Sequence, residues 1–189
     1  MNKLRDRMGR VLAVSAVALL AVALLTGCKK HETLPRPEGL PVELNGLNYT
    51  VYITRQLNLR DPEDHDYYQG PEAPPGFSYF GVFIQVCNAH DNAPFRTPVN
   101  NFRILDTQGN VYRPTSLPVT NIWAYRPRSL GSNQCIPVPG SAAAGGPTGG
   151  SLLLFKLPIP AIENRPMDLE IAPPLSGTSP KKQRIELDI

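Results

Sequence analysis

The densest group of side chains able to do chemistry is the acidic run DPEDHD at residues 61–66. Carboxylate oxygens and imidazole nitrogens bind divalent cations, so the run offers a candidate metal set. Its members are Asp61, Glu63, Asp64, His65 and Asp66. The spacing differs from that of an EF-hand calcium loop, which needs glycine where Asp66 stands. Proline-bearing acidic loops are more often simply solvated, so we expect no metal and keep these residues as an alternative site.

Groups for catalysis are scarce. His31 precedes the folded part of the chain, which leaves His65 and His90 as imidazole bases. The sequence has no G-x-S-x-G elbow, no H-E-x-x-H zinc motif and no phosphate-cradling loop. The glycine-rich residues 145–150 precede a strand pattern rather than a helix. We therefore expect no enzyme, no catalytic residue and no cofactor.

Aromatic and arginine side chains indicate protein recognition instead. Two tyrosines lie in the long segment 58–76, and a tryptophan, a tyrosine and an arginine lie together in NIWAYRPRSL. Such residues often anchor protein interfaces, and loops of that length tend to bind something. The candidate partner-binding residues are Tyr67, Tyr68, Trp123, Tyr125 and Arg126. For Trp123 and Tyr125 the alternative role is to cap the edge of the sandwich, and the segment 58–76 could instead hold a small ligand or a metal.

A leader precedes Cys28 and gives the protein an address. Four basic side chains are followed by an uncharged apolar run, residues 11–25, which is short for a membrane span of roughly 20 residues. The sequence LTGC at 25–28 resembles the lipobox of bacterial lipoproteins. That resemblance implies cleavage after residue 27 and a diacylglycerol on the Cys28 sulfur. An uncleaved signal anchor or an ordinary signal would leave Cys28 as an unexplained thiol.

Removing residues 1–27 also changes the charge of the chain. The leader holds four of the 19 basic and one of the 16 acidic side chains, so 15 of each remain. A net charge of zero gives no reason to expect a nucleic-acid partner. The following residues, 28–41, are polar and proline-rich, which predicts a flexible tether. We expect a lipid anchor on the extracytoplasmic face of a membrane in the cell envelope.

Cys87 and Cys135 are the remaining cysteines, and export favours a disulfide between them. A bridge closing a loop of this length contributes roughly 4 kcal/mol in the chain-entropy description. In a strand, Cys87 lies on the face opposite Phe80, Val82 and the other core residues. We therefore expect the bridge to join a strand end to residues 131–140 rather than to cross the core.

Short β-type runs broken by proline and glycine fill residues 42–189. Alternation in NYTVYIT places Tyr49, Val51 and Ile53 on one face, and alternation in residues 77–88 makes that run the strongest strand. NFRILD and VYRP flank the turn TQGN, which predicts a hairpin. SLLLFKLP, MDLEI and QRIELDI supply further strands, and the inner faces of the last two should carry Leu169, Ile171, Ile185, Leu187 and Ile189. The pattern predicts an antiparallel immunoglobulin-like sandwich of about seven to nine strands.

The succession FGVFIQVCN, FRILDTQGNVY, a glycine-marked loop and LLLFKLP resembles the telokin-like, immunoglobulin-related domains of exported bacterial lipoproteins. The similarity covers roughly residues 45–175. It implies a sandwich at the cell envelope and no particular activity. The chain differs from the pattern in its segment 58–76, its glycine-rich residues 140–150 and its extra cysteines. We expect a lipid-anchored domain that binds another envelope or extracellular protein.

The lipid anchor depends on one sulfur atom. We expect Cys28→Ala to abolish incorporation of labelled palmitate and to block conversion to the shorter mature form, whereas Cys87→Ala keeps both. Metabolic labelling with gel analysis measures the two outcomes. A Cys28→Ala protein that stays membrane-bound and uncleaved, with an unlabelled wild type, would show that the anchor is a helix.

Overall fold

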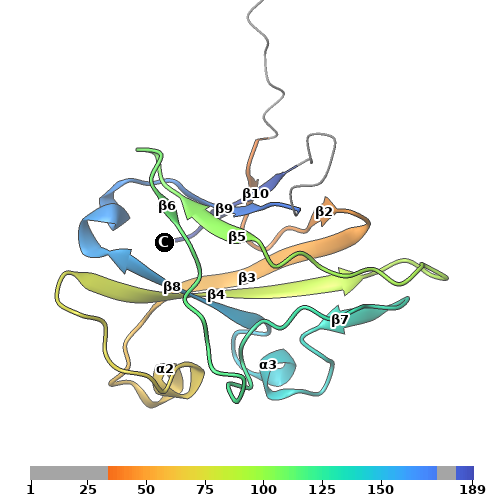
Figure 1. The fold of residues 1–189 in the computed structure, drawn as a ribbon, viewed down its shortest axis with the longest axis horizontal. Coiled ribbons are helices and arrows are strands. Elements are labelled where there is room, and N and C mark those ends of the chain that lie inside the picture. Colours follow the sequence, from red (N-terminus) through yellow and green to blue (C-terminus); the bar gives the residue numbers. More distant parts are fainter. Residues whose placement is uncertain (1–33, 174–181) are drawn as a thin grey trace, which may run out of the picture. The chain divides into compact units, whose positions relative to one another are not determined.

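The computed structural model describes residues 34–173 and 182–189, and these form two facing β-sheets (Figure 1). The expected all-β sandwich is confirmed. The strands are β1 (Arg36–Pro37), β2 (Val42–Leu44), β3 (Leu47–Leu57), β4 (Phe77–Asn88), β5 (Phe102–Leu105), β6 (Val111–Tyr112), β7 (Gln134–Ile136), β8 (Ser151–Pro158), β9 (Met167–Ile171) and β10 (Gln183–Leu187). The short helices are α2 (Pro62–Tyr67), α3 (Ala142–Gly145) and the 3-10 helix η1 (Ile159–Glu163).

Sheet A has the order β1-β10-β9-β5-β6, and sheet B has the order β2-β3-β4-β7 with β8 also paired to β4. β4 is the central strand of sheet B, because β3 pairs with one of its edges while β8 and β7 pair with different parts of the other edge. The described residues form ten strands, one more than the upper expectation, because β1 and β6 have only two residues each. All pairs are antiparallel except β1 with β10, which is parallel.

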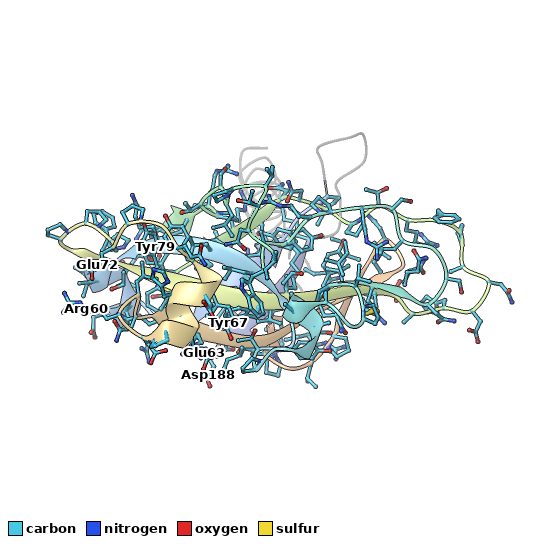
Figure 2. The ribbon with its side chains drawn as sticks, turned by 90° about the horizontal axis from the view of Figure 1, so that it is seen from below. Arg60, Glu63, Tyr67, Glu72, Tyr79 and Asp188 are labelled. Atoms are coloured by element: carbon cyan, nitrogen blue, oxygen red, sulfur yellow. A yellow bond between two sulfur atoms is a disulfide. The ribbon has the colours of Figure 1, made fainter. Side chains whose placement is uncertain are left out.

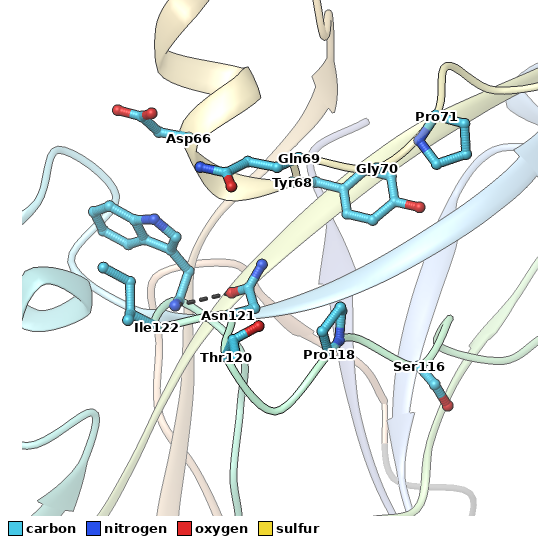
Figure 3. Close-up of a pocket in the computed structure, with 11 residues that line it drawn as sticks. Asp66, Tyr68, Gln69, Gly70, Pro71, Ser116, Pro118, Thr120, Asn121 and Ile122 are labelled. Carbon is cyan, nitrogen blue, oxygen red and sulfur yellow. Dashed lines mark hydrogen bonds between the residues drawn. The ribbon is translucent and has the colours of Figure 1, made fainter.

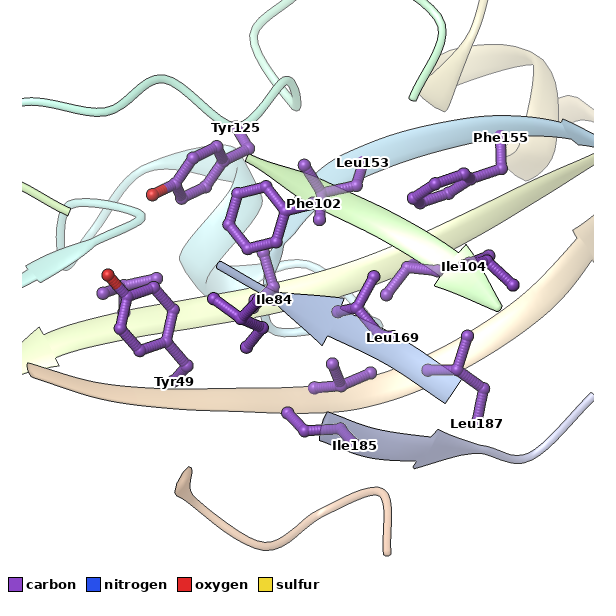
Figure 4. Packing of buried hydrophobic residues seen from close by; sticks show 14 of the residues in the cluster. Tyr49, Ile84, Phe102, Ile104, Tyr125, Leu153, Phe155, Leu169, Ile185 and Leu187 are labelled. Carbon is purple, nitrogen blue, oxygen red and sulfur yellow. The ribbon is translucent and has the colours of Figure 1, made fainter. Parts of the chain in front are cut away.

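The main core lies between the two sheets (Figure 4). The alternation in β4 is confirmed, since its alternate residues from Phe80 to Val86 are buried there. Leu169 of β9 and Ile185 and Leu187 of β10 meet them from sheet A, as the sequence predicts. The hairpin of β5 and β6 is also present.

One strand breaks its alternation. In β3, Val51 pairs with Ile84 but Ile53 pairs with Phe83, so Tyr52 is an extra residue at a β-bulge. A bulge reverses which face each later residue occupies. Ile53 is therefore 37% exposed and Thr54 is buried. The expectation that Ile53 points into the core was wrong for this reason.

The residues expected to end a flexible tether belong to the fold. β1 pairs with β10, and Gly39 donates its N–H to the Val51 carbonyl, so this segment contacts both sheets. The Glu38 carboxylate accepts the N–H of Thr54 at 2.7 Å and that of Asp188 at 3.1 Å. The predicted boundary at residue 42 was therefore too late. Residues 36–39 are polar and contain proline, so their sequence gives no strand signal. Their bonds to β10 and β3 depend on contacts between distant parts of the chain.

Cys87 and Cys135 form a disulfide, and they lie directly opposite each other on β4 and β7. The bridge joins two neighbours within sheet B, at the end of the longest strand. Both the pairing and its position away from the inter-sheet core confirm the expectation from the sequence.

The two sheets differ in their outer faces. On sheet A the outer face carries charge, with Glu170 of β9 between Arg103 of β5 and Arg184 of β10. Burial raises the pKa of Glu170, but the bond and charge of Arg103, helped by Lys182, lower it overall. On sheet B the outer face of β4 is apolar and needs a cover.

Asp106 fixes the β5–β6 hairpin. Its carboxylate accepts hydrogen bonds from the backbone N–H groups of Gln108 and Asn110, the side chain of Asn110, the Tyr112 hydroxyl and the Asn164 amide. Burial raises the pKa of Asp106, but these bonds outweigh it and lower the pKa from 3.8 to about 2. The charged form is therefore the one that the turn binds.

This network predicts acid sensitivity. Since the folded pKa lies below the unfolded one, the stabilisation is complete above about pH 4 and is lost as the pH falls toward 2. We expect Asp106→Asn, which places an amide among donors, to lower the free energy of unfolding by about 1–3 kcal/mol at pH 7. The gap from wild type should narrow between pH 4 and pH 2 in urea unfolding. A gap that does not change with pH would contradict this role.

Candidate functional site

The sequence predicts a long loop at residues 58–76. The structure differs, because this segment contains the helix α2. Asp61 caps the helix by accepting the N–H of Glu63 at 2.9 Å, and Pro62 occupies the first turn. An aspartate followed by proline and two acids is a recognisable helix start, and this signal was available in the sequence. At the ends of the segment, Arg60 and Glu72 form an exposed ion pair of 3.1 Å (Figure 2).

The acidic side chains of α2 fasten the helix to sheet B. Asp64 is buried, accepts the N–H of Asn58 at 2.8 Å and pairs with Arg55 of β3 at 2.8 Å. Glu63 takes the other nitrogen of the same guanidinium at 2.8 Å. Arginine presents a planar fork of donors that suits two carboxylates. This ion-paired set clamps α2 against the strand.

The five residues of the alternative metal site do not act together in the structure. Asp61 is the cap, Glu63 and Asp64 pair with Arg55, and His65 and Asp66 are exposed. Within residues 34–173 and 182–189, no three His, Cys, Asp or Glu side chains converge as metal ligands do. The structure therefore gives the acidic run a structural role in the helix.

Beneath α2 lies a second, smaller core on the outer face of sheet B. Tyr67 is 1% exposed, and its ring meets Phe83 at 4.8 Å and Trp123 at 4.9 Å between centroids. The two aromatic segments, residues 58–76 and 121–130, therefore lie together in the fold. Tyr67, however, is an internal residue of this core and cannot meet a partner directly (Figure 2).

A strap formed by residues 113–127 runs along the free edge of β8. Thr115 donates its N–H to the Leu154 carbonyl at 2.6 Å, and farther on Tyr125 donates to Leu152 at 2.9 Å. Leu152 in turn donates to the Trp123 carbonyl at 2.7 Å. These bonds cover an edge that would otherwise be open to pairing. Between the two attachment points, residues 116–122 project outward.

Tyr125 also belongs to the interior, in the main core. Its ring packs edge-on against Phe102 at 5.2 Å, and its hydroxyl donates to the Val99 carbonyl at 3.0 Å (Figure 4). The Tyr49 hydroxyl accepts the Val99 N–H at 3.0 Å, so two tyrosines hold one loop residue. Burial raises the pKa of Tyr125, and Tyr49 adds to the effect. The expectation that Tyr125 contacts a partner was wrong; its capping alternative is correct.

Arg126 is exposed but acts on the strap itself. Its guanidinium donates to the carbonyl oxygens of Leu117 at 2.9 Å and of Pro118. These bonds hold the projecting residues 116–122 in place. Arg126 therefore stabilises the conformation of the strap.

An open groove of about 760 Å³ lies between residues 66–71 and residues 116–123, and we call it the strap groove (Figure 3). Asn121 joins its two walls, because its amide donates to the Tyr67 carbonyl at 2.8 Å while its oxygen accepts the Trp123 N–H at 2.9 Å. Ile122 is 70% exposed on the rim. The lining comprises Asp66, Tyr68, Gln69, Gly70, Pro71, Ser116, Pro118, Thr120, Asn121, Ile122 and Trp123.

Tyr68 gives the upper wall its aromatic surface. The ring packs against Tyr79 at 5.0 Å and folds over Gly70, where a Cβ would lie 2.2 Å from the Tyr68 Cζ. Burial and the hydroxyl of Tyr79 raise the pKa of Tyr68. Gly70 is thus required for this ring position. Of the five residues expected to bind a partner, Tyr68 and Trp123 line the groove; Asn121 and Ile122 line it too, and no motif in the sequence marks them.

No family model and no curated protein matches the chain. Among solved structures, the yjhA protein from Bacillus subtilis is similar, with a TM-score of 0.52 and 11% sequence identity over 81% of this chain and 99% of that chain. At that identity the likeness shows the fold alone. In the described part of the chain, no helix has the length and apolarity to cross a membrane. The leader and Cys28 lie outside the described residues, so the lipoprotein resemblance stays a prediction.

The two kinds of site residue should respond differently to truncation. We expect Tyr67→Ala to lower the free energy of unfolding by about 3–5 kcal/mol, because it opens a cavity among packed rings. Ile122→Ala removes an exposed side chain and should change that free energy by less than about 0.5 kcal/mol. Urea unfolding at neutral pH measures both. Equal losses in the two variants would refute this division into core and surface.

Proposed function

We propose that this protein is a lipid-anchored cell-envelope protein whose β-sandwich binds another envelope or extracellular protein through the strap groove. The observation that carries the proposal is the groove itself. It brings Tyr68, Ile122 and Trp123 together at the surface, beside the smaller core on the outer face of sheet B. Tryptophan and tyrosine are the side chains that contribute most often to binding at interfaces.

The frame behind the groove favours binding because it is already ordered. The Trp123 ring packs edge-on against Tyr67 and also lies over Gly146, where a Cβ would come within 2.9 Å of Cζ3. Asn121 and Arg126 fix the backbone of the strap. A surface held in this way loses little conformational entropy when a partner arrives.

The position of the groove suits a membrane-anchored protein. The chain enters the domain at β1 in sheet A, whereas α2, whose Asp66 lines the groove, lies on the outer side of sheet B (Figure 1). The groove is therefore on the other sheet from the point where the chain enters the domain, so a partner can reach it without displacing β1.

A small-molecule ligand is the second candidate, and one observation favours it. A volume of about 760 Å³ falls within the range of small-molecule sites. The apolar surface, however, continues past the groove onto its rim, where Val119 is 91% and Ile122 is 70% exposed. A small ligand would leave this rim in water, whereas a protein would cover it.

A crosslinking experiment in cells tests the proposal. A photo-crosslinking amino acid replaces Ile122 in the full-length protein, and the matched control carries it at Ile159, another exposed isoleucine, which does not line the groove. We expect one dominant crosslinked protein at position 122 that is absent at position 159 and is lost on adding Trp123→Ala. The same products at both positions, or none at 122, would refute protein binding at the groove.

A further inference from the structure

The chemistry of the strap groove indicates which kind of partner segment it accepts, and this inference rests on the proposed function. We propose that the occupant is an extended, proline-containing segment of the partner protein that carries a basic side chain beside Asp66. Three observations lead there: which backbone groups are already used, which side chains line the groove, and where its charge lies.

The backbone around the groove offers few free hydrogen-bonding groups with which a β-strand could pair. The free edge of β8 is covered by the strap, through Thr115 at one end and Trp123 and Tyr125 at the other. Pro71 and Pro118 lie on opposite walls, and proline has no N–H to offer a neighbouring strand. A polyproline II segment needs no ladder of hydrogen bonds, because its backbone has none internally and stays solvated.

The side chains instead match such a segment. Proline-rich peptides dock on aromatic-lined grooves, where their rings pack on flat apolar faces. Tyr68 and Trp123 supply the aromatic faces, one on each wall. A proline segment offers carbonyl oxygens and few N–H groups, so the groove should supply donors. The Trp123 indole N–H forms no hydrogen bond with another described residue, and Gln69, which also lines the groove, carries an amide.

The charge of the groove is confined to one end. Asp66 is the one ionisable acid or base, tyrosine aside, among the lining residues. It is exposed, and no cationic side chain within the described parts of the chain pairs with it. Figure 3 shows Asp66 at the edge of the wall that also carries Gln69 and Gly70. An arginine or lysine of the bound segment would find its partner there, which fixes the direction of the segment.

The single tryptophan of the chain lies in the groove, so its fluorescence reports occupancy directly. The full-length protein in mild detergent is titrated with three acetylated peptides: arginine followed by six prolines, glutamate followed by six prolines, and arginine followed by six alanines. Anisotropy of labelled peptides detects any binding that leaves the emission unchanged. We expect saturable binding of the first peptide and binding of the alanine peptide that is at least tenfold weaker.

Two variants separate the parts of the proposal. Asp66→Asn should reduce the preference for arginine over glutamate by roughly two- to fivefold, which is the range of an exposed ion pair, without changing the melting temperature. Gly70→Ala displaces the Tyr68 ring and should weaken both proline peptides equally. Gly109→Ala strains the β5–β6 turn, where φ is +81°, and should weaken neither, so it controls for a general loss of stability. Equal binding of proline and alanine peptides, or an arginine preference unchanged by Asp66→Asn, would overturn the proposal.

Failure here is distinct from failure of the proposed function. If Ile122 crosslinks to a partner but no peptide binds up to millimolar concentration, the groove binds proteins through a folded surface and this inference is wrong. If the crosslink is also absent, both proposals are wrong.

Discussion

The arrangement of this domain depends on a strand that is buried on both faces. β4 turns Phe80, Val82 and the residues alternating with them toward sheet A, and turns Tyr79 and Phe83 the other way. A two-layer sandwich satisfies only the first set. Because exposing the second set would cost the free energy of hydrating large aromatic rings, the outer face of sheet B needs a third layer. The short helices and the strap supply it.

That third layer is thin, and its thinness creates the groove. α2 has six residues and covers little surface by itself, so the strap must approach from the other side to complete the cover. The two contact each other through the Tyr67 and Trp123 rings and separate beyond them, where the Asn121 amide donates to the Tyr67 carbonyl. The floor of the groove is therefore made of packed core residues, whereas its rim is open to solvent. The need to cover the apolar outer face of sheet B and the proposed binding groove thus have one origin.

The parts of the fold that follow from local alternation were predictable from the sequence. The inward residues of β4, β9 and β10, the hairpin and the disulfide all depend on strand periodicity or on cysteine position. The direction of Ile53 was not predictable, because one inserted residue at Tyr52 reverses the alternation without a glycine or proline to mark it. The site was half predictable. Aromatic type indicated where residues meet, but whether Tyr67 and Tyr125 face solvent depends on layers that are distant in sequence.

The entry of the chain at β1 has a mechanical consequence. This segment hydrogen-bonds to the last strand and to β3, and the Glu38 carboxylate holds backbone groups of both Thr54 and Asp188. A pull on the N-terminal side therefore does not peel away a single loose end. Tension applied along β1 would load the hydrogen bonds of the parallel β1–β10 pair in shear, so both residue pairs would have to separate together. A domain tethered from this side and gripped from the other would carry force across both sheets before any strand is released.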